Sequence, residues 1–219
     1  MELAGVLGQR IRLPHKLCRL DATVIDLCAQ VFDWAQFQAA KGAVKLHLLL
    51  DHDGHLPSYA VITPGKVHEI RIARQKKLPR GAMVVFDRGF NDSAWLGELT
   101  EQGVLFVTRM KDNADSVVVE RRPVSEAGRA AGVRADEIVV FCQQATADNR
   151  RFFRRVRYWD AERQREFVFL RNHYTLAPSV VAAVYRERWQ VELFFKALKQ
   201  NPRVKTFVGT SANALKIQI

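Results

Sequence analysis

The most informative segment of the chain is YRERWQVELFFKALK, which runs from Tyr185 to Lys199. At about 100° per residue, a helix would place Tyr185, Arg188, Glu192 and Lys199 within an arc of roughly 60°, as one polar stripe. An adjoining face is apolar, as in a helix that packs on a core; it contains Val184, Val191, Phe194, Phe195 and Leu198. The pattern predicts a helix edge from which a carboxylate can reach a metal ion and two cations can reach a phosphate.

The same spacing has a plainer explanation, which the sequence leaves open. Glu192 and Lys196 are four residues apart, so they could form the ion pair that is common on exposed helices. Glu187 fits neither interpretation, because it falls inside the apolar arc. The stripe alone therefore indicates a candidate site and does not identify its chemistry.

Length and composition indicate one globular domain, 1–219, with a basic surface. The 219 residues are 48% hydrophobic and 26% charged, which is enough apolar material for a sizeable core and excludes a disordered chain. The net charge of +11 and the pI near 10.0 favour a polyanionic partner. Basic charge alone does not show which one.

Cysteine usage and hydropathy favour a reducing, aqueous compartment. Cys18, Cys28 and Cys142 are odd in number and far apart, which argues against a disulfide framework or a structural zinc site. No apolar run approaches the length of a membrane span, and the N-terminus lacks the apolar core of a signal peptide. We therefore expect a cytoplasmic protein with no membrane partner.

The first half of the chain predicts an α/β fold that begins with strands. Residues 17–27 alternate between apolar and polar positions, which predicts a half-buried strand with Asp21 at its middle. Two further apolar runs, 43–51 and 56–64, flank a polar turn and predict a hairpin. The run 82–86 is continuously apolar, as in a strand that is covered on both faces.

Helical patterns follow, and they frame a second β-rich region. Segments 67–77 and 92–102 are predicted helices, and 104–109 is a predicted strand, so that 82–109 forms a strand, helix, strand unit of the parallel, right-handed type. Residues 113–172 contain short β-like runs separated by polar turns, and we interpret them as a β-rich insertion subdomain. One long helix, 178–200, is then predicted to return the chain to the core, with Pro178 in its first turn.

Three carboxylates could meet in this arrangement. Asp21 lies in the first strand, and Asp87 follows the buried strand 82–86, where ligands collect in open α/β sheets. If these strands are neighbours, Glu192 can complete the set from the helix. Three carboxylates repel one another unless cations neutralise them, and oxygen ligands suit Mg²⁺ or Mn²⁺. Local explanations stay open, because Asp21 could pair with Arg19 and Asp87 could belong to a plain turn.

The pattern Tyr-x2-Arg-x3-Glu-x6-Lys resembles the YREK signature of the insertion sequence 4 family of bacterial DDE transposases. LDAT at 20–23 and DRGF at 87–90 are similar to the first and second aspartate motifs of that family. The resemblance implies a ribonuclease H-like fold, which is a mixed sheet flanked by helices. It also implies a β-rich insertion before the last catalytic helix.

The resemblance also implies a function. Asp21, Asp87 and Glu192 would be the catalytic and metal-binding residues, holding two Mg²⁺ or Mn²⁺ ions. Tyr185, Arg188 and Lys199 would contact DNA. The enzyme would hydrolyse phosphodiester bonds at the inverted repeats of transposon ends and transfer the freed strand to target DNA. It would act as a homodimer on the bacterial nucleoid.

Residues 150–159 form the densest basic and aromatic segment of the chain. A strand there would present arginines to phosphates and an aromatic ring to a displaced base, which makes these residues candidate DNA contacts. The candidates are Arg154, Arg155, Arg157 and Trp159. A solvated edge strand whose charges discourage aggregation explains the same composition.

Two other functions remain open. The first is a DNA-binding remnant that no longer transposes, and the second is a stand-alone nuclease of the same fold. Only about 20 residues precede Asp21, and a helical pattern is still running at Ile219, so we expect a chain truncated at both ends with uncertain activity.

Overall fold

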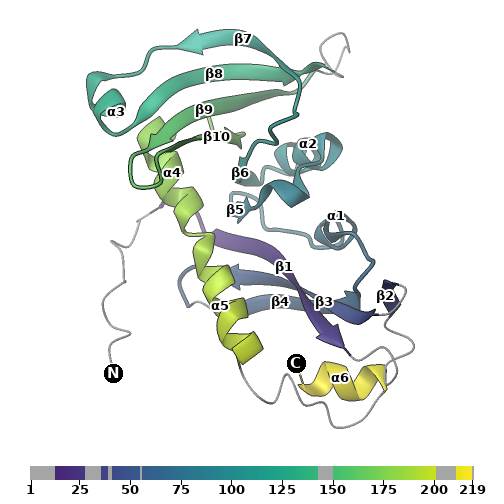
Figure 1. Ribbon diagram of the computed structural model, residues 1–219. Helices are drawn as coiled ribbons and strands as arrows, with labels where there is room; N and C mark the ends of the chain where they lie inside the picture. Colours follow the sequence, from purple (N-terminus) through teal and green to yellow (C-terminus); the bar gives the residue numbers. More distant parts are fainter. Residues whose placement is uncertain are drawn as a thin grey trace.

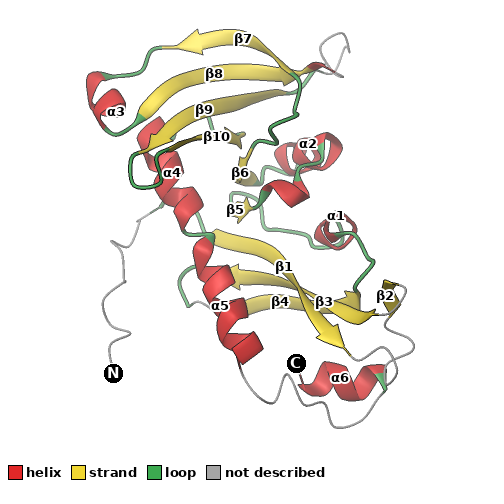
Figure 2. Ribbon diagram, in the orientation of Figure 1, coloured by secondary structure: helices red, strands yellow, loops and turns green. Residues whose placement is uncertain are grey.

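The computed structural model describes residues 13–27, 36–38, 41–54, 56–142, 150–200 and 211–218 (Figures 1 and 2). Cys28 and Ile219, on which two of the expectations above rest, lie outside the described residues. In the described part the chain forms one large mixed sheet with helices on both faces.

The sheet has ten strands. Nine form a continuous path, and β4 (Pro57–Pro64) pairs with β3 beside it. In spatial order the path is β2 (Gln36–Gln38), β3 (Lys41–Asp51), β1 (Leu17–Leu27), β5 (Met83–Phe86), β6 (Leu105–Arg109), β10 (Arg165–Arg171), β9 (Phe152–Asp160), β8 (Val133–Phe141) and β7 (Ser116–Arg122).

A different set of helices covers each face of the sheet. One face carries α1 (Glu69–Ala73) and α2 (Ser93–Glu101). The other carries α4 (Pro178–Arg186), α5 (Trp189–Gln200) and α6 (Ala212–Gln218). The short α3 (Glu126–Ala130) lies between β7 and β8, and the 3₁₀ turn η2 (Arg88–Phe90) follows β5. None of the described helices is long and apolar enough to cross a membrane.

Strand β5 is apolar along its whole length because both of its faces are covered. Val84 and Phe86 pack towards α2 on one face, whereas Met83 and Val85 pack towards α4 on the other. All four side chains are fully buried. The predicted two-sided cover of 82–86 is therefore confirmed.

The predicted hairpin and the predicted parallel unit of the first half are also confirmed, and the strands of Asp21 and Asp87 prove to be neighbours. β1 pairs antiparallel with β3, and β3 pairs antiparallel with β4 as the expected hairpin. β1 then pairs parallel with β5, and β5 pairs parallel with β6, so the strands that carry Asp21 and Asp87 are neighbours.

The β-rich segment between β6 and α4 continues the same sheet. β7, β8, β9 and β10 pair antiparallel in sequence, and β10 joins the rest of the sheet by pairing antiparallel with β6. This strand pairing extends the sheet well past its parallel centre (Figure 1). The description of 113–172 as a subdomain stays an interpretation.

Two predicted helices differ from the structure. The predicted helix 67–77 is only the five-residue α1. The predicted single helix 178–200 is wrong, because α4 ends at Arg186 and α5 begins at Trp189. At the junction the amides of Glu187 and Arg188 donate to carbonyls three residues back, at 3.2 and 3.0 Å, instead of four. The chain therefore tightens there before α5 begins.

Candidate active site

The pairing of β1 with β5 places two aspartates side by side. Leu20 and Phe86 are the last paired residues of the two strands, and Asp21 and Asp87 follow them directly. Because side chains alternate along a strand, both aspartates point away from α2 and towards the α4 and α5 face. Neighbouring strands lie about 4.8 Å apart, so the register alone brings the two carboxylates into one neighbourhood.

Gly89 is explained by space around Asp87 and not by an unusual backbone angle. The Asp87 carboxylate caps η2 by accepting a hydrogen bond from the Gly89 amide at 2.7 Å. A Cβ atom at Gly89 would lie 2.8 Å from Asp87 Oδ1, so a side chain at this position would force the Asp87 carboxylate to move. The DRGF motif therefore holds the Asp87 carboxylate against its own backbone turn.

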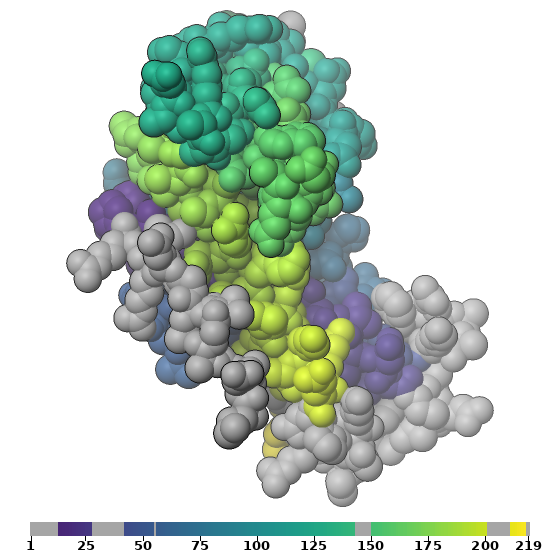
Figure 3. Space-filling model, turned by 60° about the vertical axis from the view of Figure 1, so that its left-hand side comes forward, coloured from purple at the N-terminus to yellow at the C-terminus, as the bar shows by residue number. Residues whose placement is uncertain are grey.

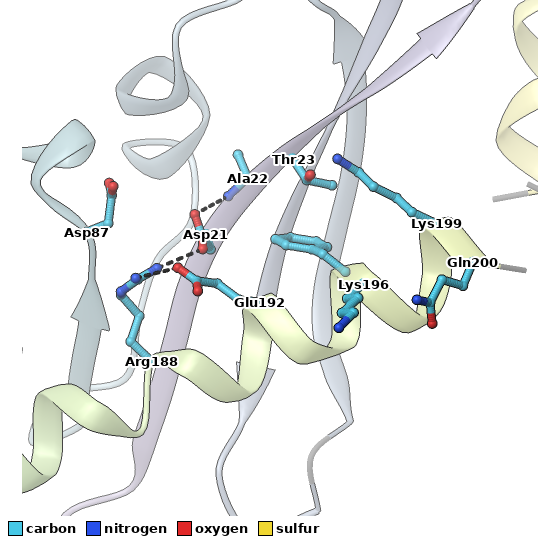
Figure 4. A pocket seen from close by; sticks show the side chains of 10 residues that line it. Asp21, Ala22, Thr23, Asp87, Arg188, Glu192, Lys196, Lys199 and Gln200 are labelled. Atoms are coloured by element: carbon cyan, nitrogen blue, oxygen red, sulfur yellow. Dashed lines mark hydrogen bonds and ion pairs between the residues drawn. The ribbon is translucent and has the colours of Figure 1, made fainter. Parts of the chain in front are cut away.

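Arg188 joins the other two carboxylates. Its Nη1 donates to Asp21 Oδ2 at 3.1 Å, and its Nη2 donates to Glu192 Oε1 at 2.5 Å (Figure 4). Arg188 lies at the α4 to α5 junction and Glu192 lies one turn further on, so one guanidinium ties β1 to α5. Asp21 pairs with Arg188 and not with Arg19, and Glu192 pairs with Arg188 and not with Lys196.

The three carboxylates line one open cavity of about 710 Å³. Its rim is basic because Arg188, Lys196 and Lys199 contribute to the wall. In Figure 4, Lys199 extends from the last turn of α5 towards Thr23 of β1. Figure 3 shows α5 (yellow-green) beside the end of β1 (purple), below the region of β9 and β10 (green). The cavity thus opens onto a surface with positive charge around a negative centre.

The environment of Asp21 disfavours its ionised form. The pKa of Asp21 is raised to about 6, mainly by burial. The charges of Asp87 and Glu192 add to the rise, whereas Arg188 and the Ala22 amide oppose it. A carboxyl pKa raised in this way indicates that the positive charge nearby does not fully offset burial and the neighbouring carboxylates. A divalent cation at this place would remove the penalty.

The donor set fits a hard divalent cation. All three groups are carboxylates, which are the ligands that Mg²⁺ and Mn²⁺ prefer. Among the described residues, no three His, Cys, Asp or Glu side chains lie close enough together to hold a metal ion as they stand. Arg188 supplies the positive charge between Asp21 and Glu192, and Asp87 stands across from them (Figure 4).

Two residues of the predicted stripe have different surroundings. Tyr185 is almost fully buried, where its ring contacts Phe169 with centroids 5.1 Å apart, and burial raises the pKa of its hydroxyl. The Arg188 guanidinium lies 5.6 Å from the centre of the Tyr185 ring, so Tyr185 supports Arg188 from beneath. Lys199 is exposed and lines the cavity.

The basic segment of β9 does not reach the carboxylates. Val156 packs with α4, so alternation turns Arg155, Arg157 and Trp159 towards the opposite face of the sheet. Glu137 binds the guanidinium of Arg155 at 2.7 Å, and Glu166 binds that of Arg157 at 2.9 Å.

Arg154 points towards α4 but is buried. Its guanidinium forms a bidentate pair with Asp136 and donates to the backbone carbonyls of Tyr174 and Leu176. It fixes the loop that leads into α4, so the prediction that it contacts DNA phosphates is not supported and we withdraw it.

A second basic and aromatic cavity, which the sequence patterns did not indicate, lies on the other side of Arg188. It has a volume of about 80 Å³ and lies between the β9 to β10 turn and the α4 to α5 junction. The Arg163 guanidinium lies 4.8 Å from the ring centre of Trp189, which is 44% exposed. Arg109 and Arg165 lie over Phe167 at 4.8 and 4.4 Å. These contacts join residues far apart in sequence, so no local motif could reveal them.

The anomalous position of Glu187 is also explained. Its carboxylate Oε2 lies 2.7 Å from Nη2 of Arg19, which is completely buried on β1. A continuous helix would place Glu187 in an apolar arc. A charged residue at that position was therefore a sign in the sequence that the helix is not continuous.

Comparisons with known proteins identify the family. The transposase DDE domain family matches residues 13–219. The chain belongs to this family. It is 29% identical over 220 residues to a putative transposase, y4zB, of Sinorhizobium fredii, covering 99% of this chain and 61% of that protein. It is also 29% identical over 211 residues to a probable transposase for insertion sequence element IS5377 of Geobacillus stearothermophilus, covering 95% of this chain and 54% of that one.

A solved structure supports the ribonuclease H-like fold. The chain resembles the piggyBac transposase in its synaptic complex with hairpin DNA, with a TM-score of 0.50 over 94% of this chain and 46% of that one. Sequence identity is only 9%, so the likeness concerns the fold alone. The predicted transposase family and fold are both confirmed.

The burial of Arg154 predicts a structural role with a measurable cost. Arg154→Ala should lower the free energy of unfolding by about 3–5 kcal/mol, because it strands the Asp136 carboxylate, which is 3% exposed. Arg157→Ala is the matched control on the same strand. Its side chain is 48% exposed, so its pair with Glu166 should contribute no more than about 1 kcal/mol. Equal losses in urea unfolding would contradict this assignment.

The raised pKa of Asp21 predicts a pH-dependent stability. Its usual value of 3.8 applies in the unfolded chain and about 6 in the folded chain, so the folded chain binds more protons between these values. In metal-free buffer the free energy of unfolding should therefore fall by up to about 3 kcal/mol as pH rises from about 4 to 6.

Asp21→Asn should remove that part of the pH dependence. Asp26→Asn, an exposed substitution on the same strand, should keep it. Urea unfolding at several pH values in the presence of a chelator measures both. If the Asp21→Asn profile runs parallel to that of the native chain, the proposed cost of ionising Asp21 is wrong.

Proposed function

We propose that this chain is the catalytic domain of a DNA transposase that breaks and joins phosphodiester bonds at transposon ends. The observation that carries the proposal is the convergence of Asp21, Asp87 and Glu192 on one open cavity with a basic rim. Membership of the transposase DDE domain family supports it. The chain spans 61% and 54% of the two relatives, so the activity of a whole transposase is part of the proposal.

The three carboxylates would hold two Mg²⁺ or Mn²⁺ ions. When bound, such ions activate the attacking oxygen and stabilise the leaving oxygen of an in-line phosphoryl transfer. Asp21 and Asp87 come from adjacent strands of a rigid sheet, and Glu192 comes from a helix packed on it. This gives the ligands fixed positions, as an active site requires.

The basic residues around the cavity would bind DNA. Arg188 and Lys199 would neutralise phosphates beside the reacting bond, and Tyr185 would hold the Arg188 guanidinium in place. Arg163 and Trp189 extend this surface on the far side of Arg188. On the face of the sheet opposite the cavity, DNA would contact Arg155, Arg157 and Trp159.

The partners and the setting follow from the same proposal. The DNA would be the inverted repeats of the transposon ends and then the target, with two copies of the chain acting as a homodimer. The reaction would take place in the bacterial cytoplasm at the nucleoid. A remnant without activity or a nuclease without strand joining remain the alternatives to be distinguished.

Cleavage of a labelled transposon-end duplex in Mg²⁺ or Mn²⁺ tests this proposal. The native chain should nick the DNA and join the freed 3′ end to a second duplex. Glu192→Gln removes a charged metal ligand with little change in shape. Loss of a residue that only supports a metal ligand typically lowers activity by about 10 to 100-fold, so nicking should fall by at least that factor. Glu126→Gln in α3 is the control and should cut normally.

Each alternative has its own outcome in this assay. Nicking without joining would indicate a nuclease. Salt-sensitive DNA binding without nicking by the native chain would indicate a remnant and would overturn the proposal. Equal nicking by the native chain and Glu192→Gln would remove Glu192 from the site.

A further inference from the structure

The ion pair between Arg19 and Glu187 links the same two elements as the pair in the carboxylate site. Arg19 lies two residues before Asp21 on β1, so both side chains point to the same face. Glu187 directly precedes Arg188 at the α4 to α5 junction. The two pairs have opposite polarity, since the strand supplies the cation in one and the carboxylate in the other.

Because the two ion pairs have opposite polarity, only one position of the α4 to α5 junction on β1 satisfies both of them. A shift of the junction along β1 would place Glu187 near Asp21, or Arg188 near Arg19, and bring like charges together. The Arg19 side chain is 0% exposed and that of Glu187 is 19% exposed, so solvent screens this pair little. His52 adds a contact on the same side, with Nδ1 at 2.5 Å from Arg19 Nη2.

The pair also coincides with the break between α4 and α5. In a continuous helix Glu187 would fall on the apolar face. The tight turn at 187 and 188 instead turns its carboxylate towards Arg19. Because α5 begins at Trp189, the direction of this helix, and with it the position of Glu192, depends on how the junction is held.

We propose that Arg19 and Glu187 are positioning residues for the active site. Their ion pair holds the α4 to α5 junction on β1 and thereby keeps Arg188 and Glu192 within reach of Asp21. Neither residue lines the carboxylate cavity. Glu187 acts through Arg188, which follows it directly, and Arg19 acts by holding the junction on the strand that carries Asp21. This inference rests on the proposed function for its effect on catalysis, but the geometry that it predicts can be measured without DNA.

Glu187→Gln tests the proposal because it removes the charge and keeps the size of the side chain. The matched control is Glu69→Gln. Glu69 also binds a largely buried strand cation, Lys45, at 2.7 Å, with exposures of 29% and 11%. Both variants lose one comparable ion pair, but only Glu187 adjoins the active site. Glu187→Asp keeps the charge and serves as the conservative variant.

Two readouts separate positioning from stability. In crystals of Glu187→Gln we expect the contact between Arg188 Nη1 and Asp21 Oδ2, 3.1 Å in the native chain, to be lost. In Mn²⁺ titrations without DNA we expect binding to weaken by about 10 to 100-fold. Glu69→Gln should leave both unchanged even if its melting temperature falls, and Glu187→Asp should recover part of the Mn²⁺ affinity.

The outcomes distinguish this proposal from the proposed function. If Glu187→Gln keeps the Arg188 to Asp21 contact and native Mn²⁺ affinity, the positioning role is overturned. An equal loss of Mn²⁺ affinity in Glu69→Gln would also overturn it, because the effect would then follow general destabilisation. If the native chain binds no Mn²⁺ or cuts no DNA, the proposed function fails, and the crystal geometry of Glu187→Gln still decides the positioning role.

Discussion

The parallel pairing of β1 with β5 is the constraint on which the candidate site depends. Leu20 and Phe86 form its last pair, and both bury their side chains towards α2. The next residue on each strand is an aspartate that must point to the opposite face. A slip of one residue in this register would turn Asp21 into the α2 core, where an ionised carboxylate would be strongly disfavoured. The packing of apolar side chains on one face therefore positions the charged groups on the other.

Electrostatics then determines how α5 meets this sheet. Asp21 is largely buried, and burial raises its pKa, so the folded chain needs positive charge at this point. Arg188 provides it in the structure, and Glu192 shares the same guanidinium. A divalent ion would provide more positive charge in less space. Either Arg188 or a bound divalent ion would neutralise these carboxylates. The site would therefore bind both metal ions and DNA phosphate.

Features with a local signal could be predicted from the sequence. The alternation at 17–27, the hairpin that follows and the apolar run 82–86 each depend on one strand and its two faces, and each matches the structure. The position of Asp87 at a strand end followed from the same pattern. The polar stripe at Tyr185 to Lys199 contributes Arg188, Glu192 and Lys199 to the cavity, but the assumption of one continuous helix was wrong.

The remaining features depend on partners far away in the chain. The break before α5 coincides with a contact between Glu187 and Arg19, which are 168 positions apart. Arg154 reads as a surface cation in its basic segment, yet Asp136 on β8 accounts for its burial. The pairing of β10 with β6, which joins the strands β7 to β10 to the rest of the sheet, likewise has no local signal.

Asp21, Asp87 and Glu192 would together bind a divalent metal ion, and anomalous diffraction from crystals of this chain soaked in Mn²⁺ tests this binding. We expect anomalous density in the carboxylate cavity, about 2 Å from oxygens of Asp21 and Asp87 and within reach of Glu192. Mn²⁺ density only at other sites, with Arg188 still bridging Asp21 and Glu192, would show that these carboxylates do not form a metal site.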